Sequence, residues 1–185
     1  MNDSNSNKSL SSLQVRKLTF SALYLAIAMV LPFLTGQIPE IGSMLCPMHL
    51  PALLCGFVCG WPWGLAVGFI SPLLRSAVFG MPAMYSAIAM AFELGVYGLS
   101  SGLLYRLLPK KKWRIYAALI AAMILGRLLW GGATYLLAGL RGTEFTPAIF
   151  LAAAVVNAIP AIVLQLVLVP LLVAVHEKAG LMLNK

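Results

Sequence analysis

The stretch HLPALLCGFVCGWPWGLAVGFISPLLRS, residues 49–76, holds most of two apolar segments that a short turn separates. We place these segments at about 49–60 and about 63–79. Across the turn, small residues recur at every fourth position: Gly56, Gly60, Gly64 and Gly68. Because such a stripe lets helix backbones approach closely inside a membrane, it predicts two tightly packed apolar helices.

The rest of the chain is equally apolar. Hydrophobic residues make up 61% of the 185 residues and charged residues only 10%, whereas a soluble domain has about 25% charged residues. This composition predicts an all-α integral membrane protein. We read six apolar segments, at about 18–34, 49–60, 63–79, 83–106, 115–140 and 147–175. A spanning helix needs about 20 residues, so the second segment is short and the last two can tilt or protrude.

The segments leave no room for a soluble domain. We therefore predict one membrane domain over residues 16–185, a six-transmembrane-helix bundle. Residues 1–15, MNDSNSNKSLSSLQV, are polar, and we expect them to be a disordered cytoplasmic N-terminus.

The distribution of basic residues predicts the orientation in the cell membrane. With six spans, one side of the membrane carries ten basic residues: Lys8, Arg16, Lys17, Arg106, Lys110, Lys111, Lys112, Arg114, Lys178 and Lys185. The other side carries Arg141 together with Glu40 and Glu144. Because cytoplasmic loops are enriched in lysine and arginine, we expect a multi-pass protein with both termini in the cytoplasm.

Three charged residues lie inside the apolar segments: Arg75, Glu93 and Arg127. A charge at the bilayer centre costs about 3 kcal/mol or more, so such side chains usually face a bundle interior or a cavity. Counting residues from the segment ends places all three between the middle and the outer half of the membrane. The trio therefore predicts one polar pocket that opens to the outside.

The chemistry of this pocket has two interpretations. Glu93 could pair with Arg75 or Arg127 and simply tie the helices together, since charges in membranes mostly pair. However, two arginines and one carboxylate leave a positive charge over, and an arginine fork suits a carboxylate or phosphate. We therefore predict a site for a small anionic or zwitterionic solute, with seven candidate substrate-binding residues: His49, Arg75, Glu93, Tyr97, Arg127, Trp130 and Asn157.

We predict that the protein is not an enzyme and has no nucleotide site of its own. The HExxH and GxxxxGK[ST] patterns are absent. If the protein moves its solute across the membrane, it would therefore need energy from a partner or an ion gradient. Soft ligand types occur in Met44-Leu-Cys46-Pro-Met48-His49, but their spacing is irregular. We predict no metal site and no cofactor.

In the first segment, Ala22 and Ala26 form an AxxxA step within SALYLAIAM, which favours helix docking. Together with the six segments, the basic residues before the first of them and the stretch from His49 to Ser76, this step resembles the substrate-binding S-component of energy-coupling factor (ECF) transporters. The resemblance covers nearly the whole chain and is strongest over residues 48–98, which include FGMP and AMAFELGVYG.

The resemblance implies a small bundle that captures a vitamin or related micronutrient from outside. It implies a transmembrane T-component, docked on Ala22 and Ala26, and two ATPase subunits that hydrolyse ATP. It also implies that the loop 35–48 gates the pocket. The region around FISPLLRS and FGMP is most similar to pantothenate-type S-components. Pantothenate would use an arginine, with Glu93, Asn157 and His49 as hydrogen-bonding partners.

Three other readings stay open on the sequence alone. A neutral ligand such as pyridoxine or hydroxymethylpyrimidine would use Glu93 and aromatic walls instead of an arginine. An MreD-like structural scaffold of cell-wall assembly has a similar size and number of spans but needs no outward pocket. A stand-alone secondary transporter often shows internal repeats, and we see no convincing repeat between residues 18–80 and 115–175.

Overall fold

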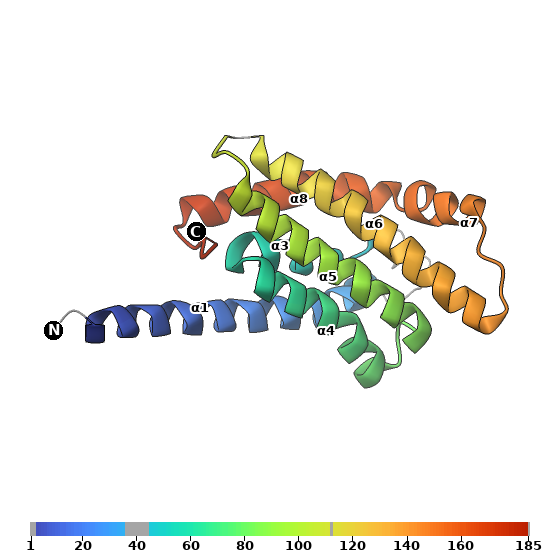
Figure 1. The fold of residues 1–185 in the computed structure, drawn as a ribbon, viewed down its shortest axis with the longest axis horizontal. Helices are drawn as coiled ribbons and strands as arrows, with labels where there is room; N and C mark the ends of the chain where they lie inside the picture. Colours follow the sequence, from blue (N-terminus) through green and yellow to red (C-terminus); the bar gives the residue numbers. More distant parts are fainter. Residues whose placement is uncertain (1–2, 36–44, 112, 185) are drawn as a thin grey trace.

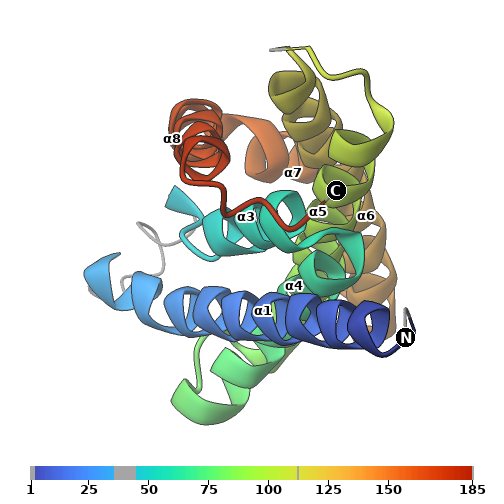
Figure 2. The same ribbon diagram turned by 90° about the vertical axis from the view of Figure 1, so that its left-hand side faces the viewer.

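The computed structural model describes residues 3–35, 45–111 and 113–184, and all regular structure within these residues is helical. Figures 1 and 2 show the arrangement from two sides. In chain order the elements are α1 (Asp3–Val30), the 3-10 turn η1 (Leu31–Thr35), α3 (His49–Cys59), α4 (Trp61–Phe79), α5 (Met84–Leu107), α6 (Arg114–Arg141), α7 (Pro147–Leu151), the π-helical turn η2 (Ala152–Val156) and α8 (Ile159–Lys178).

The predicted all-α membrane bundle is confirmed. Within the described residues, five helices are long and apolar enough to cross a membrane: the segment Ser12–Leu34 that includes most of α1, and α4, α5, α6 and α8. The second predicted segment is α3, which has 11 residues and therefore a length of about 16 Å at about 1.5 Å per residue. That is about half of the hydrocarbon thickness of a bilayer, so α3 is a half-length helix inside the bundle.

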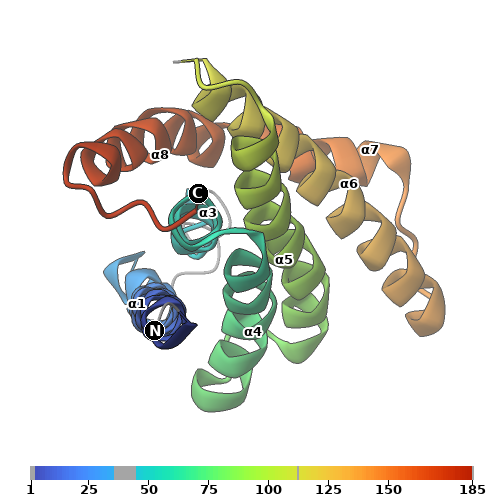
Figure 3. The ribbon, with the colours of Figure 1, turned by 60° about the vertical axis from the view of Figure 1, so that its left-hand side comes forward.

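Helix α3 forms the centre of the molecule. Every one of its residues is buried, and it contacts α1, α4, α5 and α8 (Figure 3). The helix ends at Gly60, whose φ of 102° a residue with a side chain rarely adopts. The chain then reverses directly into α4. The four surrounding helices therefore hold α3, including its first residue His49, inside the bundle.

Glycines allow the backbones of α4 and α5 to touch. A Cβ atom added to Gly68 would lie 2.1 Å from the carbonyl oxygen of Leu94, and one added to Gly98 would lie 2.1 Å from that of Gly64. The glycine stripe therefore does allow close packing of helix backbones, but the helix that α4 packs against most closely is α5 and not α3. Gly56 on α3 also packs against Gly98 and Ser101 of α5.

The last predicted segment is not one helix. Instead of a continuous helix over about 147–175, the chain forms α7, the π-helical turn η2 and α8. The break comes just before Pro160, in the first turn of α8. Proline lacks an N–H group and its ring clashes with the carbonyl four residues earlier, so a regular α-helix does not continue through this point.

Two expectations concern segments near the N-terminus. We expected residues 1–15 to be disordered, whereas the structure shows α1 from Asp3 onward, with its first turns extending beyond the bundle (Figure 1). No proline or glycine interrupts this helix, which allows it to continue through the polar residues. Of the predicted gating loop 35–48, residues 36–44 lie outside the described part of the chain.

Candidate functional site

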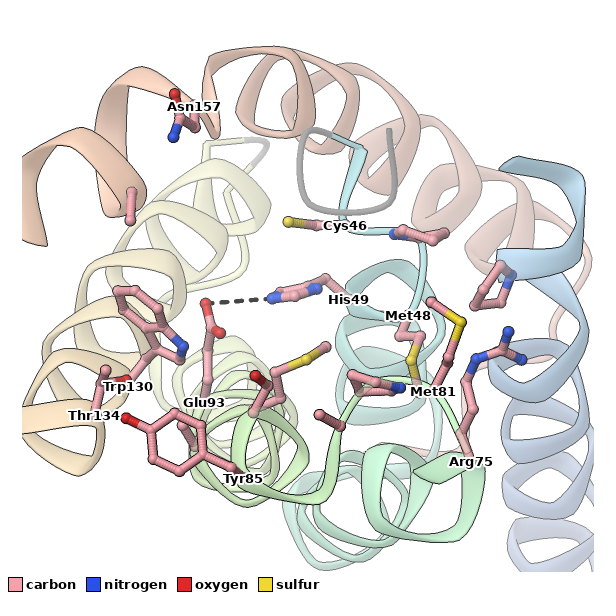
Figure 4. A pocket seen from close by; sticks show the side chains of 18 of the residues that line it. Cys46, Met48, His49, Arg75, Met81, Tyr85, Glu93, Trp130, Thr134 and Asn157 are labelled. Carbon is pink, nitrogen blue, oxygen red and sulfur yellow. Dashed lines mark ion pairs between the residues drawn. The ribbon is translucent and has the colours of Figure 1, made fainter. Parts of the chain in front are cut away.

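A cavity of about 650 Å³ lies at the N-terminal end of α3. This volume falls in the range of about 300–1,000 Å³ that small-molecule sites occupy. Figure 4 shows side chains from several helices around it. Its lining includes Cys46, Met48, His49, Arg75, Tyr85, Glu93, Arg127, Trp130, Thr134, Ala153 and Asn157.

Three of the predicted residues form a charged cluster in this cavity. Oε1 of Glu93, on α5, lies 3.1 Å from Nη1 of Arg127 on α6. The same oxygen lies 3.2 Å from Nε2 of His49, the first residue of α3. Glu93 is only 1% exposed and His49 only 2% exposed. Because a lone buried charge is costly, the opposite charges of Glu93 and Arg127 stabilise each other here.

The cluster keeps unused capacity for hydrogen bonding. Its contacts to Glu93 are at ion-pair distance but outside hydrogen-bond geometry. Within the described residues, Nδ1 of His49 and Nε of Arg127 are also buried without a hydrogen-bond partner. Buried polar atoms in proteins almost always have a partner, so an arrangement of this kind is typical of a site that a ligand or ordered water completes.

Arg75 lines the same cavity, but it is not part of the ion-paired cluster that is centred on Glu93. Its guanidinium donates a hydrogen bond to the carbonyl oxygen of Met29, in the last turn of α1. It also lies 4.8 Å from the ring centre of Phe33 and 5.2 Å from that of Phe79. A cation is favourable at a helix C-terminus, where carbonyl groups lack partners. Arg75 therefore fastens the end of α1 while lining another side of the cavity (Figure 4).

The remaining candidates have different surroundings. Trp130 and Asn157 line the cavity. Tyr97 is 1% exposed and is not among the lining residues. Its ring packs edge-on against His49, with 5.1 Å between the ring centres. Tyr97 therefore supports the imidazole from behind, because its i+4 spacing from Glu93 puts it one turn further along α5.

Cys46 is a cavity residue that we had not counted among the binding candidates. Nη2 of Arg127 donates a hydrogen bond to its sulfur over 3.7 Å. Burial raises the pKa of the Cys46 thiol above its ordinary value, which keeps the thiol protonated at neutral pH. Its position three residues before His49 in the sequence was the available signal. Within the described residues, no group of three His, Cys, Asp or Glu side chains could hold a metal ion.

One pattern match in α5 has no catalytic geometry. Residues 98–102 read GLSSG and fit the GxSxG pattern of serine hydrolases. That pattern requires a sharp strand-to-helix turn that exposes the serine. Here the segment is the interior of a helix, Ser100 donates to the carbonyl of Val96, and Ser101 donates to that of Leu53. These hydroxyl groups serve helix packing.

The predicted docking residues are on the outer surface of the bundle. Ala22 and Ala26 are exposed on α1, whereas Ser21, Tyr24 and Ala28 are buried on its inner side. The small side chains therefore form part of the face of α1 that another membrane helix can reach.

The fold and the cavity together define a multi-span membrane protein with a small-molecule pocket built around buried charges. The chain belongs to the family described as ECF transporter, substrate-specific component, whose model matches residues 16–173. No curated protein and no solved structure was found to match the chain. Membership of this family makes the chain the substrate-binding subunit of an ECF transporter. A scaffold of cell-wall assembly, which size alone allowed, does not fit this family.

Proposed function

We propose that the protein binds a vitamin-sized carboxylic acid in the cavity at the start of α3, with pantothenate as the best candidate. The observation that carries the proposal is the charge of the cavity. Its described lining contains two cations, Arg75 and Arg127, and one anion, Glu93. Two positive charges less one negative charge leave one net positive charge when His49 is neutral. An unpaired positive charge is costly in a water-poor site, and an anionic ligand would neutralise it.

Pantothenate complements the arrangement of polar groups. Its carboxylate accepts hydrogen bonds from Arg127 and His49, whose Nε and Nδ1 atoms have no partner among the described residues. Its hydroxyl and amide groups reach Glu93 and Asn157, which line the same cavity. Arg75, for which no carboxylate lies within ion-pair distance in the described part of the chain, contributes a second positive charge. Trp130 supplies an apolar wall for the rest of the ligand.

A neutral aromatic vitamin such as pyridoxine or hydroxymethylpyrimidine is the second candidate. The observation in its favour is that two aromatic side chains, Tyr85 and Trp130, line the cavity. Such a ligand would stack on Trp130 and bond to Glu93, while Arg127 stays paired with Glu93. The two candidates differ in how much they depend on a cation in the cavity.

The remaining parts of the proposal concern the complete transporter. The subunit binds its ligand without converting it chemically and needs no cofactor of its own. ATP is hydrolysed by two ATPase subunits, which act through a transmembrane T-component that docks on Ala22 and Ala26. The cavity opens outward, and both termini lie in the cytoplasm, in keeping with the basic residues at that side.

Equilibrium binding to the purified protein tests the ligand. Replacing Arg127 with Met should weaken pantothenate by about 2–4 kcal/mol, because it removes one partner of a buried charged contact. It should change the affinity for pantothenol, which has an alcohol in place of the carboxylate, much less. Arg75→Met should weaken pantothenate as well, by removing the second cation.

The exposed Arg106 gives a matched control, since Arg106→Met removes an equal charge outside the cavity. If both cavity variants bind pantothenate as well as the wild type does, the charge argument is wrong. If the wild type binds pyridoxine or hydroxymethylpyrimidine and ignores pantothenate, the neutral ligand replaces it.

A further inference from the structure

The short helix α7 is attached to α6 through a small aromatic contact. Phe150 lies so close to Gly131 that a Cβ added there would come within 2.4 Å of the ring. Trp130 stacks on the same ring at an interplanar angle of 27°, and Phe145 lies edge-on to Phe150, with 6.5 Å between the ring centres. We call Trp130, Phe145 and Phe150 the aromatic clasp. No residue of α7 is buried, so the clasp is the main packing that the structure shows for this helix.

Beyond the clasp, α6 and the chain from α7 to α8 are separated by an apolar groove. The groove has a volume of about 450 Å³ and is lined from one side by Ile124 and Leu128 and from the other by Val155 and Ile162. Its wall also includes Arg127, which lines the main cavity as well. The groove therefore lies directly behind the charged cluster, and moving α7 away from α6 would join it to the cavity.

The segment 147–158, which carries Phe150 of the clasp, is joined to α8 by irregular backbone. It contains the π-helical turn η2 and ends next to the first turn of α8, which contains Pro160. Irregular turns of this kind interrupt the rigid hydrogen-bond ladder of a helix and are frequent at functional sites. The same segment contributes Ala153 and Asn157 to the cavity wall (Figure 4). A movement of this segment would therefore open the cavity at that wall.

We propose that residues 147–158 form a gate of the cavity, held shut by the aromatic clasp on Gly131. The gate swings on the break just before Pro160, at the start of α8, and admits the ligand past Trp130 and Asn157. The proposal goes beyond the proposed function, because it does not depend on which ligand binds.

Two variants open the gate and one neighbouring variant serves as its control. Gly131→Ala places a methyl group against the Phe150 ring, and Phe150→Ala removes the ring. Gly132→Ala makes the same chemical change one residue away, where nothing lies within 4 Å of the added Cβ. All three alanines favour a helix, so the two glycine variants differ mainly in their effect on the clasp.

The thiol of Cys46 reports opening without any ligand. It lines the cavity and is only 9% exposed. We expect a water-soluble maleimide to label Cys46 at least about tenfold faster in Gly131→Ala and Phe150→Ala than in the wild type, since each variant undoes the aromatic contact that holds α7 on α6. Gly132→Ala should react at the wild-type rate. Cys55 and Cys59, which are both 0% exposed, should stay unlabelled throughout and thereby show that the bundle is intact.

Wild-type labelling rates in both clasp variants would overturn the gate, and so would an equal acceleration in Gly132→Ala. Binding kinetics with pantothenate as the probe provide a second readout. An easier gate speeds association and dissociation by a similar factor and leaves the dissociation constant within about threefold, whereas a damaged site speeds dissociation only. If the wild type does not bind pantothenate, the proposed ligand fails while the labelling result still decides the gate.

Discussion

Glu93 is the residue on which the charged cluster depends. Its single negative charge lies between Arg127 and His49 in a site where both Glu93 and His49 are almost fully buried. Removing two charges from water is expensive, and mutual attraction compensates for that cost only while both partners are present. The cluster is therefore sensitive to the loss of either charge, and its members belong to α3, α5 and α6.

Glu93→Gln keeps the size of the side chain and removes the charge. We expect the free energy of unfolding to fall by about 3 kcal/mol, because Arg127 is left as an uncompensated cation. Denaturant unfolding in detergent measures this change. Arg106→Gln, at an exposed position, should leave the stability nearly unchanged. Equal stabilities for Glu93→Gln and the wild type would show that the ion pair is not a structural support.

At the residue scale, the sequence predicted which side chains line the cavity better than it predicted their partners. The cost of a charge in an apolar segment was enough to single out Arg75, Glu93 and Arg127. Whether Glu93 pairs with Arg75 or Arg127 depends on how the three helices are rotated and how far apart they lie. The spacing of residues within one segment gives no information on either. The same holds for Tyr97, whose position one turn from Glu93 was compatible with lining the cavity or with packing behind His49.

At the scale of the helices, the contact between α4 and α5 depends on the absence of side chains. Gly98 faces Gly64 so closely that the backbone of one helix takes the place of a side chain on the other. This contact aligns α5, and with it Glu93, against the short helix α3. The glycines are thus responsible for the position of the cavity although none of Gly64, Gly68 and Gly98 lines it.

Gly98→Ala should therefore separate these helices. The added Cβ would meet backbone atoms of Gly64 at 2.1 Å, and overpacking of this kind costs about 1–3 kcal/mol, and more where the obstacle is rigid. Gly139→Ala on α6, with nothing within 4 Å of its added Cβ, is the matched control. Thermal unfolding of the two variants makes the comparison. A Gly98→Ala protein as stable as the Gly139→Ala protein would contradict the packing of α4 on α5.

Which helices form was predictable from apolar segments, but where they break was only partly so. The short length of α3 was predictable, because the apolar segment that starts at about residue 49 ends at Gly60. The break between α7 and α8 did not, although Pro160 marks it. Prolines also occur inside regular helix at Pro72 in α4 and Pro170 in α8. Tertiary packing therefore decides which proline ends a helix.

At the scale of the whole molecule, the protein has an outer surface that a partner can use and an interior reserved for the ligand. Ala22 and Ala26 lie on the exposed face of α1, whereas the charged cluster is buried in the interior of the bundle at the start of α3. The surface that docks the T-component and the site that binds the vitamin are therefore separate parts of our proposal. A substitution at one of them should leave the other intact.

Ala22→Trp and Ala26→Trp test this separation. A large ring on the exposed face of α1 should abolish association with the T-component and leave the affinity for the vitamin within about twofold. Co-purification with the T-component and equilibrium binding measure the two effects. Val163→Trp, on the exposed surface of α8, is the control for added bulk. Association that survives both alanine substitutions would contradict the docking assignment.

Mass spectrometry of the small molecules released from the purified protein tests the central claim most directly. The protein would be purified in detergent from cells supplied with a mixture of B vitamins, as the wild type and as Arg127→Met. We predict that the wild type releases one vitamin-sized carboxylic acid in an amount close to one per chain and that Arg127→Met releases almost none. The same compounds in the same amounts from both proteins would contradict a binding site built around Arg127.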